Sequence, residues 1–256
     1  MNYSKAYIYN MDSEIFSKQS DYYKKYRPEY PDEMFRFLYR HLKRRDNAYD
    51  CGTGTGTIAY RLAERFKMVY AVDVSAEQLR NAVQKENIEY SLGKAEEMPF
   101  PDRFFDLVTV GQALHWFDTD KFFGEVTRVL KPDGVIAIMG YGRIMAEEQI
   151  DVKIHEFYRT MFANYYTANR KLLEHEYRNI RFPFDETECP GFEIEYHWDI
   201  KDLQGYFYSW SAVQRYIDEN HSDPTIAIID SLRSLWKERR KVRFPVFIRL
   251  GRLNRS

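Results

Sequence analysis

A glycine-rich turn followed by an acid is the part of the chain whose residue types most clearly allow chemistry. The short apolar stretch at residues 48–51 contains Asp50, and glycines follow it at every second position: Gly52, Gly54 and Gly56. Because glycine has no Cβ, such a turn lets backbone N–H groups approach a ligand closely. A second apolar stretch ends on Asp73, where a carboxylate can accept the hydroxyls of a ribose. The pattern predicts a nucleoside-binding site on a βαβ unit.

The spacing of the glycines separates the possible nucleoside ligands. The turn reads G-x-G-x-G, and Thr57 stands where a dinucleotide-binding turn has its last glycine. This difference favours S-adenosylmethionine over NAD. A nicotinamide oxidoreductase stays open as an alternative, and it would place Asp73 on a different ribose.

Composition excludes several other classes. The chain has 256 residues and a formal net charge of −1, so no overall basic field attracts nucleic acid. Its two cysteines, Cys51 and Cys189, suggest no disulfide framework, and no metal-binding spacing is present. The longest apolar run, residues 135–139, is too short to cross a bilayer, and the first thirty residues lack a signal core. We expect a soluble, cytoplasmic enzyme without a metal and without a membrane partner.

Helical and strand patterns alternate along the first part of the chain. The hydrophobic periodicity predicts strands at residues 48–51, 68–72, 88–92, 104–110 and 135–139. Helices are predicted at residues 31–44, 55–66, 75–86 and 119–130, the third of them capped by Ser75. This alternation is typical of a doubly wound α/β fold with a mostly parallel, Rossmann-like sheet.

The second part of the chain is less regular. Residues 143–178 form an amphipathic helical stretch, and further helices are predicted at residues 202–218 and 225–239. Strands at residues 192–198 and 242–250 bring the expected sheet to seven strands. We expect one domain over residues 1–256, with an N-terminal lid and helix at 1–45 and a cofactor-binding core at 46–141. A helical cap inserted after the fifth strand, together with the last strands, would occupy residues 142–256.

The chain resembles the class I S-adenosylmethionine-dependent methyltransferases, and within them the small-molecule branch that is similar to trans-aconitate methyltransferase. The motifs that carry the resemblance are Tyr-Arg-Pro-Glu-Tyr-Pro at 26–31, the turn at 50–56, Asp-Val-Ser-Ala-Glu-Gln-Leu at 73–79, Gly-Lys-Ala-Glu-Glu-Met-Pro-Phe at 93–100, Gln-Ala-Leu-His-Trp-Phe at 112–117, Leu-Lys-Pro-Asp-Gly at 130–134, Ser-Trp-Ser-Ala-Val-Gln-Arg-Tyr at 209–216 and Phe-Pro-Val-Phe-Ile-Arg at 244–249. They span nearly the whole chain, and none of them identifies the substrate.

The resemblance implies S-adenosylmethionine as the cofactor and a role for each matching residue. Asp73 would accept both ribose hydroxyls, the turn would lie along the methionine moiety, and Asp50 would approach its ammonium group. Val74 and Gln78 would pack on the adenine, Ala95 and Glu96 would border it, and Gln112 would face the sulfonium. Tyr26 and Arg27 would close over the cofactor. The implied cofactor-binding set is Tyr26, Arg27, Asp50, Gly52, Thr53, Gly54, Gly56, Asp73, Val74, Gln78, Ala95, Glu96 and Gln112.

One position departs from the family pattern. Many relatives have an acid where Lys94 stands, and that acid accepts a hydrogen bond from the adenine amino group. A lysine has no acceptor, so this contact would pass to Glu96 or to backbone carbonyls.

The acceptor side is less defined. His115 is a candidate base or orienting residue, and Tyr23, His115 and Trp116 are candidates for substrate contact. A buried, hydrogen-bonded structural histidine is an equally good interpretation of His115. The favoured acceptor is an oxygen of a small molecule, either a carboxylate or a hydroxyl. An RNA or protein methyltransferase and a catalytically silent cofactor-binding module are the alternatives.

Overall fold

The computed structural model describes residues 26–165 and 170–253, which fold into two compact units. The sheet unit comprises residues 30–142, 170–192 and 245–253, and the helical unit comprises residues 26–29, 143–165 and 193–244. The boundary expected between core and cap, at residues 141 and 142, lies next to the second crossing between the units, at residues 142 and 143. The chain then returns to the sheet unit twice.

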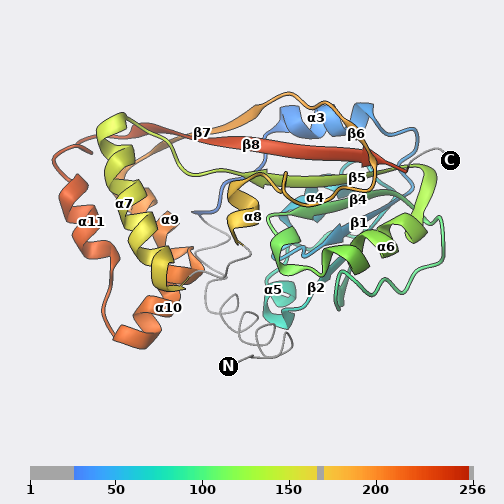
Figure 1. Cartoon of the computed structure of the whole chain (residues 1–256), viewed down its shortest axis with the longest axis horizontal. Coiled ribbons are helices and arrows are strands. Elements are labelled where there is room, and N and C mark those ends of the chain that lie inside the picture. Colours follow the sequence, from blue (N-terminus) through green and yellow to red (C-terminus); the bar gives the residue numbers. More distant parts are fainter. Residues whose placement is uncertain (1–25, 166–169, 254–256) are drawn as a thin grey trace. The chain divides into compact units, whose positions relative to one another are not determined.

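The sheet is mostly parallel, and its strand order reverses direction once (Figure 1). The order is β3-β2-β1-β4-β5-β8-β6, with β7 also paired to β8. Strands β1 to β5 are parallel to one another, and β8 is antiparallel to β5 and β6. The strands are β1 (Asn47–Cys51), β2 (Met68–Asp73), β3 (Ile88–Leu92), β4 (Phe105–Gly111), β5 (Leu130–Tyr141), β6 (Asp185–Thr187), β7 (Phe192–Trp198) and β8 (Arg240–Arg252). The reversal lies between β1 and β4, and open α/β sheets bind ligands beside the carboxyl ends of strands at such a point.

The helices of the sheet unit include those that connect the parallel strands. They are α3 (Asp32–Arg40), α4 (Thr57–Ala63), α5 (Ala76–Arg80), the 3-10 helix η1 (Leu114–Trp116), α6 (Thr119–Val129) and α8 (Arg170–Glu174). In Figure 1, α3 lies above the sheet and α6 lies below it, so helices cover both of its faces. The helical unit contains α7 (Glu148–Tyr165), α9 (Ile200–Tyr208), α10 (Ser211–Asn220) and α11 (Thr225–Leu232).

The structure confirms the predicted Rossmann-like α/β fold and corrects several details. The described sheet has eight strands, one more than the predicted seven, because the three-residue strand β6 is too short to show a hydrophobic pattern. The predicted helix at 202–218 is two helices, since the buried Trp210 adopts an extended backbone between α9 and α10. The helix predicted at 143–178 divides into α7 and α8, and the one predicted at 75–86 ends at Arg80.

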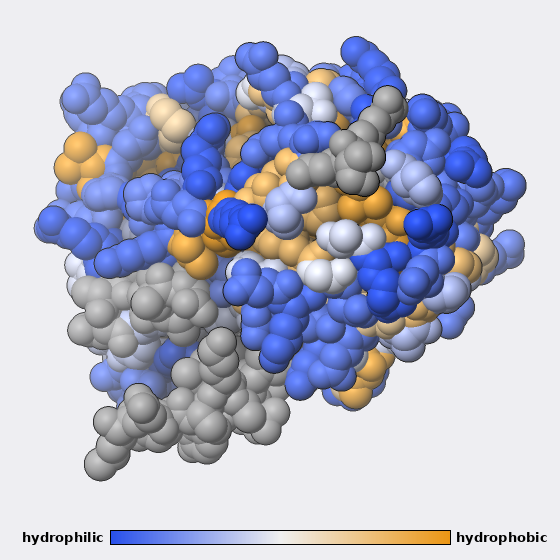
Figure 2. Space-filling model, turned by 45° about the vertical axis from the view of Figure 1, so that its right-hand side comes forward, coloured by the Kyte–Doolittle hydropathy of each residue, from blue (hydrophilic) through white to orange (hydrophobic). Residues whose placement is uncertain are grey.

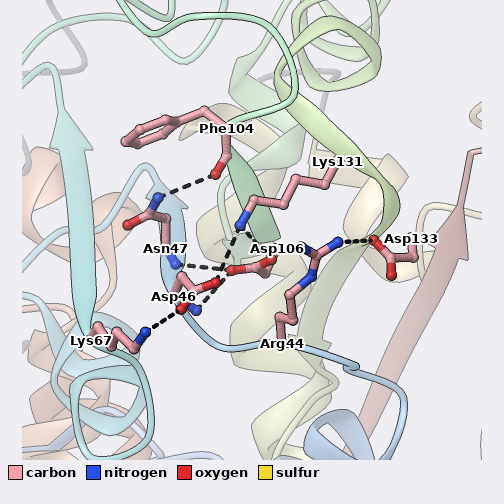
Figure 3. Close-up of polar contacts among 8 residues, drawn as sticks. All are labelled: Arg44, Asp46, Asn47, Lys67, Phe104, Asp106, Lys131 and Asp133. Carbon is pink, nitrogen blue, oxygen red and sulfur yellow. Dashed lines mark hydrogen bonds and ion pairs between the residues drawn. The ribbon is translucent and has the colours of Figure 1, made fainter.

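A buried carboxylate joins the amino ends of β1 and β4. The predicted strand at 104–110 seemed apolar throughout, but it carries Asp106, which is only 4% exposed. Its Oδ2 accepts hydrogen bonds from the backbone N–H groups of Asp46 (2.8 Å) and Asn47 (3.0 Å), and its Oδ1 accepts one from Lys131 Nζ at 2.7 Å. Figure 3 shows how these groups converge, with Lys67 paired to Asp46 beside them. These bonds fix the register of β1 against β4.

A second buried acid joins the same two strands nearer their carboxyl ends. Asp50 is fully buried, and its Oδ1 accepts a 2.7 Å hydrogen bond from the hydroxyl of Thr109, its partner on β4. The hydroxyl of Thr53 donates to Oδ2 at 2.6 Å. Burial raises the pKa of Asp50 to about 6, although the two hydroxyls lower it.

Aromatic side chains fill the core next to these strands. Tyr49 stacks on Phe105 with ring centroids 5.0 Å apart, and both also contact the ring of Phe100. Hydrophilic residues cover most of the surface in Figure 2, and five large apolar side chains are exposed among the described residues. Within the described ranges, no helix has the length and apolar character needed to cross a membrane.

We predict that Asp106→Asn lowers the free energy of unfolding by about 2–4 kcal/mol, because it leaves Lys131 and two backbone donors short of a buried charged acceptor. Urea unfolding measures the change. Asp102→Asn is the matched control, because Asp102 makes its ion pair with Arg128 at an exposed position and the loss should stay below about 1 kcal/mol. Equal losses in the two variants would contradict the role of Asp106 in joining β1 to β4.

We also predict that Asp50 destabilises the protein as pH rises. The folded chain holds the Asp50 proton more tightly than the unfolded chain does, because the pKa is about 6 in the fold and 3.8 otherwise. Stability relative to Asp50→Asn should therefore fall between about pH 4 and pH 6, by on the order of 3 kcal/mol, and level off above that range. Urea unfolding of both proteins without cofactor, from pH 4 to pH 7.5, tests this. A pH-independent difference would show that Asp50 stays ionised in the fold.

Candidate functional site

The carboxylate at the end of β2 holds the glycine turn in place. Asp73 Oδ2 accepts the backbone N–H of Gly54 at 2.8 Å, and its Oδ1 accepts the N–H of Ser75 at 2.9 Å. Burial raises the pKa of Asp73, while these N–H groups lower it. The turn and the acid, 19 residues apart, are thus one polar site.

Open space adjoins the turn at its middle glycine. Gly54 has a left-handed backbone, with φ of +58°, and among the described residues the atom nearest to a Cβ built there would be Gln78 Oε1, at 3.9 Å. A side chain at Gly54 would therefore occupy space that a ligand can use. Gly56 differs, because its Cβ would collide with the hydroxyl of Tyr90 and its glycine is needed for packing.

The other turn residues support its shape. Thr53 binds Val72 O through its N–H at 2.9 Å, as well as Asp50 through its hydroxyl. Gly52 lies against Ala113 and Phe117, so the turn contacts the segment that follows β4. Asp50 is fully buried beneath this turn, with its two oxygens on Thr53 and Thr109.

Two predicted adenine contacts follow β2. Val74 is half-buried, and Gln78 is buried in α5. Ser75 caps this helix as predicted, since its hydroxyl accepts the N–H of Gln78 at 3.3 Å. The cap and the Asp73 bond to Ser75 place the start of α5 next to the glycine turn.

The predicted pair after β3 contains a buried acceptor. Ala95 is buried, and Glu96 Oε1 accepts the backbone N–H of Asp118 at 2.7 Å. The other oxygen, Oε2, is also buried and makes no hydrogen bond to any residue that the structure describes. Lys94, by contrast, lies near the exposed Glu97, 3.6 Å from its carboxylate. Glu96 therefore offers a hydrogen-bond acceptor to a ligand amino group, and Lys94 does not.

The segment after β4 brings three further candidates to the sheet's carboxyl edge. Gln112 has a left-handed backbone, and its side chain donates to Tyr141 O on β5 at 3.2 Å. His115 is buried in η1 beside Trp116, with ring centroids 4.8 Å apart. Its Nδ1 lies 2.9 Å from the hydroxyl of Tyr177.

The predicted lid residues belong to the helical unit. Arg27 Nη2 donates to Ser209 O at 3.0 Å, and the ring of Tyr26 packs against Gly205 of α9. Their role over a cofactor stays a prediction. Tyr23, the predicted substrate contact, lies outside the described residues.

Sequence reasoning missed the residues that reach the site from a distance. Phe117 packs on Gly52, and Tyr90 covers Gly56 while its hydroxyl donates to Val83 O at 2.7 Å. Tyr177 reaches His115 across 62 residues. Phe117 lies within the motif at 112–117 and Tyr90 within the strand predicted at 88–92, but no local pattern points to Tyr177.

Comparisons with known proteins agree with this site. Residues 49–138 match a family model described as a methyltransferase domain. A Dictyostelium discoideum protein named as a methyltransferase is 33% identical over 247 residues, which cover 93% of this chain and 94% of that protein. A Mycobacterium bovis protein named as a methyltransferase is 40% identical over 119 residues, covering 46% of this chain and 48% of the other.

A solved structure resembles nearly the whole chain. It is described as a type II methyltransferase from Anaeromyxobacter dehalogenans, with a TM-score of 0.81 and 35% identity, and the match covers 90% of this chain and 99% of that one. Full-length similarity and the matched domain together show the family. The chain belongs to the class I S-adenosylmethionine-dependent methyltransferases, and S-adenosylmethionine is its cofactor.

Proposed function

We propose that this methyltransferase acts on an oxygen of a small-molecule acceptor, as a member of the branch similar to trans-aconitate methyltransferase. The observation that carries the proposal is the pairing of charges on β8. Lys241 and Arg243 lie beside Glu195 and Glu193 of β7, Arg240 pairs with Glu147, and Arg249 pairs with Glu186. These four cations are matched by acids, so together they present little net charge to a polyanion.

The same pattern weighs against an RNA acceptor. An RNA methyltransferase would need cations that neutralise successive phosphates, and the four cations just named already face carboxylates. A protein methyltransferase and a catalytically silent module would have the same cofactor site as a small-molecule methyltransferase. An experiment that identifies the methylated product distinguishes the three.

The cofactor roles follow from the polar atoms around the glycine turn. Asp73 accepts the backbone N–H groups of Gly54 and Ser75, one on each oxygen, and its carboxylate would also accept the ribose hydroxyls. Gly52, Thr53, Gly54 and Gly56 would lie along the methionine moiety, with Asp50 holding the turn from below. Val74, Gln78 and Ala95 would enclose the adenine, and Tyr26 and Arg27 would close over the bound cofactor.

Glu96 would recognise the adenine amino group in place of the acid that Lys94 replaces. Its Oε2 is buried without a partner among the described residues, and a buried carboxylate oxygen is stabilised by a donor. Its Oε1 is fixed by Asp118, which holds the side chain in one orientation.

The protein's own contribution to methyl transfer is positioning and exclusion of water. When bound, S-adenosylmethionine supplies a methyl group activated by a sulfonium. Gln112, held on Tyr141, would border the sulfonium, while His115, Trp116 and Tyr23 would contact the acceptor. A dry pocket favours an anionic oxygen acceptor, because its charge is lost as the new bond forms.

We predict that S-adenosylhomocysteine at a hundredfold above its dissociation constant raises the Tm by about 5–10 °C and that NAD does not. A shift with NAD alone would contradict this prediction.

We predict that Asp73→Asn weakens S-adenosylhomocysteine binding at least about tenfold, because it removes charge-assisted acceptors. Calorimetry measures the affinity. Asp185→Asn, at an exposed position of β6, is the control and should bind like the wild type. Unchanged affinity in Asp73→Asn would remove Asp73 from the ribose site.

We predict that label from methyl-tritiated S-adenosylmethionine enters a small-molecule fraction. The enzyme is incubated with cell extract separated into metabolites, RNA and protein, each tested alone. Base-labile label in the metabolite fraction would indicate a carboxylate ester, since methyl esters hydrolyse readily and methyl ethers do not. Label in RNA or protein would refute the small-molecule proposal, and no label above a heat-treated control in any fraction would favour a silent module.

A further inference from the structure

The histidine at the end of β4 has a partner that fixes its ring. His115 is 3% exposed, and its Nδ1 lies 2.9 Å from the Tyr177 hydroxyl. The two rings are nearly parallel, at 20°, with centroids 6.1 Å apart. A neutral imidazole carries one proton, on either Nδ1 or Nε2. If Nδ1 accepts the Tyr177 hydroxyl, the proton is on Nε2, which can only donate; if Nδ1 donates to Tyr177, Nε2 has a lone pair and can accept a proton.

Tyr177 is held in an unusual backbone conformation. It follows α8, is fully buried, and has φ of 56°, directly after Glu176 with φ of 54°. Two successive residues with side chains rarely adopt left-handed angles. The N–H of Tyr177 donates to Leu172 O at 2.7 Å, which turns the chain back so that the ring enters the core.

An arginine on β8 clamps this turn from outside. Arg249 Nη1 donates to Tyr177 O at 2.6 Å and to Ile180 O at 3.2 Å. Its Nε and Nη2 donate to the two oxygens of Glu186, at 2.8 and 2.9 Å. This bidentate pair lowers the pKa of Glu186, so the clamp is charged at neutral pH. The chain of contacts runs from Glu186 through Arg249 and Tyr177 to His115.

Chemistry decides which group donates between Tyr177 and His115. A phenol O–H is a stronger acid than a neutral imidazole N–H, and an imidazole nitrogen is a better acceptor than a phenol oxygen. The stable arrangement therefore has the Tyr177 hydroxyl donating to Nδ1, with the imidazole proton on Nε2.

We propose that Tyr177 is a positioning residue that holds His115 in the Nε2–H tautomer, and that Arg249 and Glu186 hold Tyr177 there. His115 then presents a hydrogen-bond donor and has no free lone pair with which to act as a base. This inference rests on the proposed function, and it selects orientation of the acceptor over proton removal. An acceptor that fits this arrangement has an oxygen that is already deprotonated, such as a carboxylate, because His115 takes no proton from it.

The tautomer can be read directly from protein labelled with ¹⁵N in its six histidines and saturated with S-adenosylhomocysteine. Long-range ¹H–¹⁵N spectra distinguish the protonated ring nitrogen from the unprotonated one, and His115→Gln identifies the resonance. We expect a protonated Nε2 and an unprotonated Nδ1 in the wild type. A proton on Nδ1 would overturn the proposal and make His115 available as a base.

Two variants test the positioning chain. Tyr177→Phe keeps the ring and removes the hydroxyl, so the two tautomers should become mixed. Glu186→Gln weakens the clamp from the surface and should shift the populations in the same direction to a smaller extent. An unchanged tautomer in Tyr177→Phe would overturn the role of Tyr177, and an unchanged one in Glu186→Gln would overturn that of the clamp.

Tyr39→Phe is the matched control, because it removes a hydroxyl that donates to Arg61 O at 2.9 Å in the same unit, and it should leave the His115 spectrum unchanged. A change in Tyr39→Phe equal to that in Tyr177→Phe would reveal a general loss of packing and refute the specific role. Binding of S-adenosylhomocysteine is measured on the same samples. Loss of the proposed function would appear there or in the fractionation, whereas loss of this inference appears only in the tautomer.

Discussion

The pairing of β1 with β4 is the constraint on which the rest of the structure depends. The strand order reverses there, so the carboxyl ends of these two strands border the place where such sheets bind ligands. Two buried acids fasten the pair at different heights, Asp106 through the backbone N–H groups before and in β1, and Asp50 through Thr109. A shift of one residue would turn every side chain of either strand to the other face and misplace the glycine turn. Aromatic packing around Tyr49 supplies apolar burial, but the two acids supply register.

Several groups near the carboxyl ends of β1 and β4 lower the stability of the folded chain. Asp50 is ionised at neutral pH although burial opposes its charge, and Glu96 keeps a buried oxygen without a donor among the described residues. Three left-handed glycines and the left-handed Gln112 lie in the same region. Proteins keep such local costs where a ligand recovers them on binding. Asp106 and Asp50 thus differ in purpose, because Asp106 is paired with the cation of Lys131, whereas Asp50 accepts hydrogen bonds from the neutral hydroxyls of Thr53 and Thr109.

Charge on the later part of the chain is used mainly for structure. In the sequence, the arginines and lysines near the end of the chain look like a basic tail, which could guide anions. In the fold, Lys241 and Arg243 meet Glu195 and Glu193 of β7, Arg249 meets Glu186 of β6, and Arg240 meets Glu147. Arg239 and Arg252 instead donate to the backbone carbonyls of His197 and His41. Arg249 shows how far such a pair can reach, since it fixes the backbone of Tyr177 and, through that ring, His115.

The sequence by itself determined the α/β fold, four of the five parallel strands within one residue at each end, the central part of β5, the Ser75 cap, and the joining of the glycine turn to Asp73. These features follow from hydrophobic period, from glycine's conformational freedom and from short spacings, all of which are local. Only the tertiary structure decided that β6 adds an eighth strand to the described sheet and that Trp210 divides one predicted helix. It also decided that Glu96 has a buried oxygen with no hydrogen bond from any described residue, and that Tyr177 lies against His115. These depend on contacts between residues far apart in the chain. The positions involved carry no local pattern, because their conformations are imposed by the side chains packed against them.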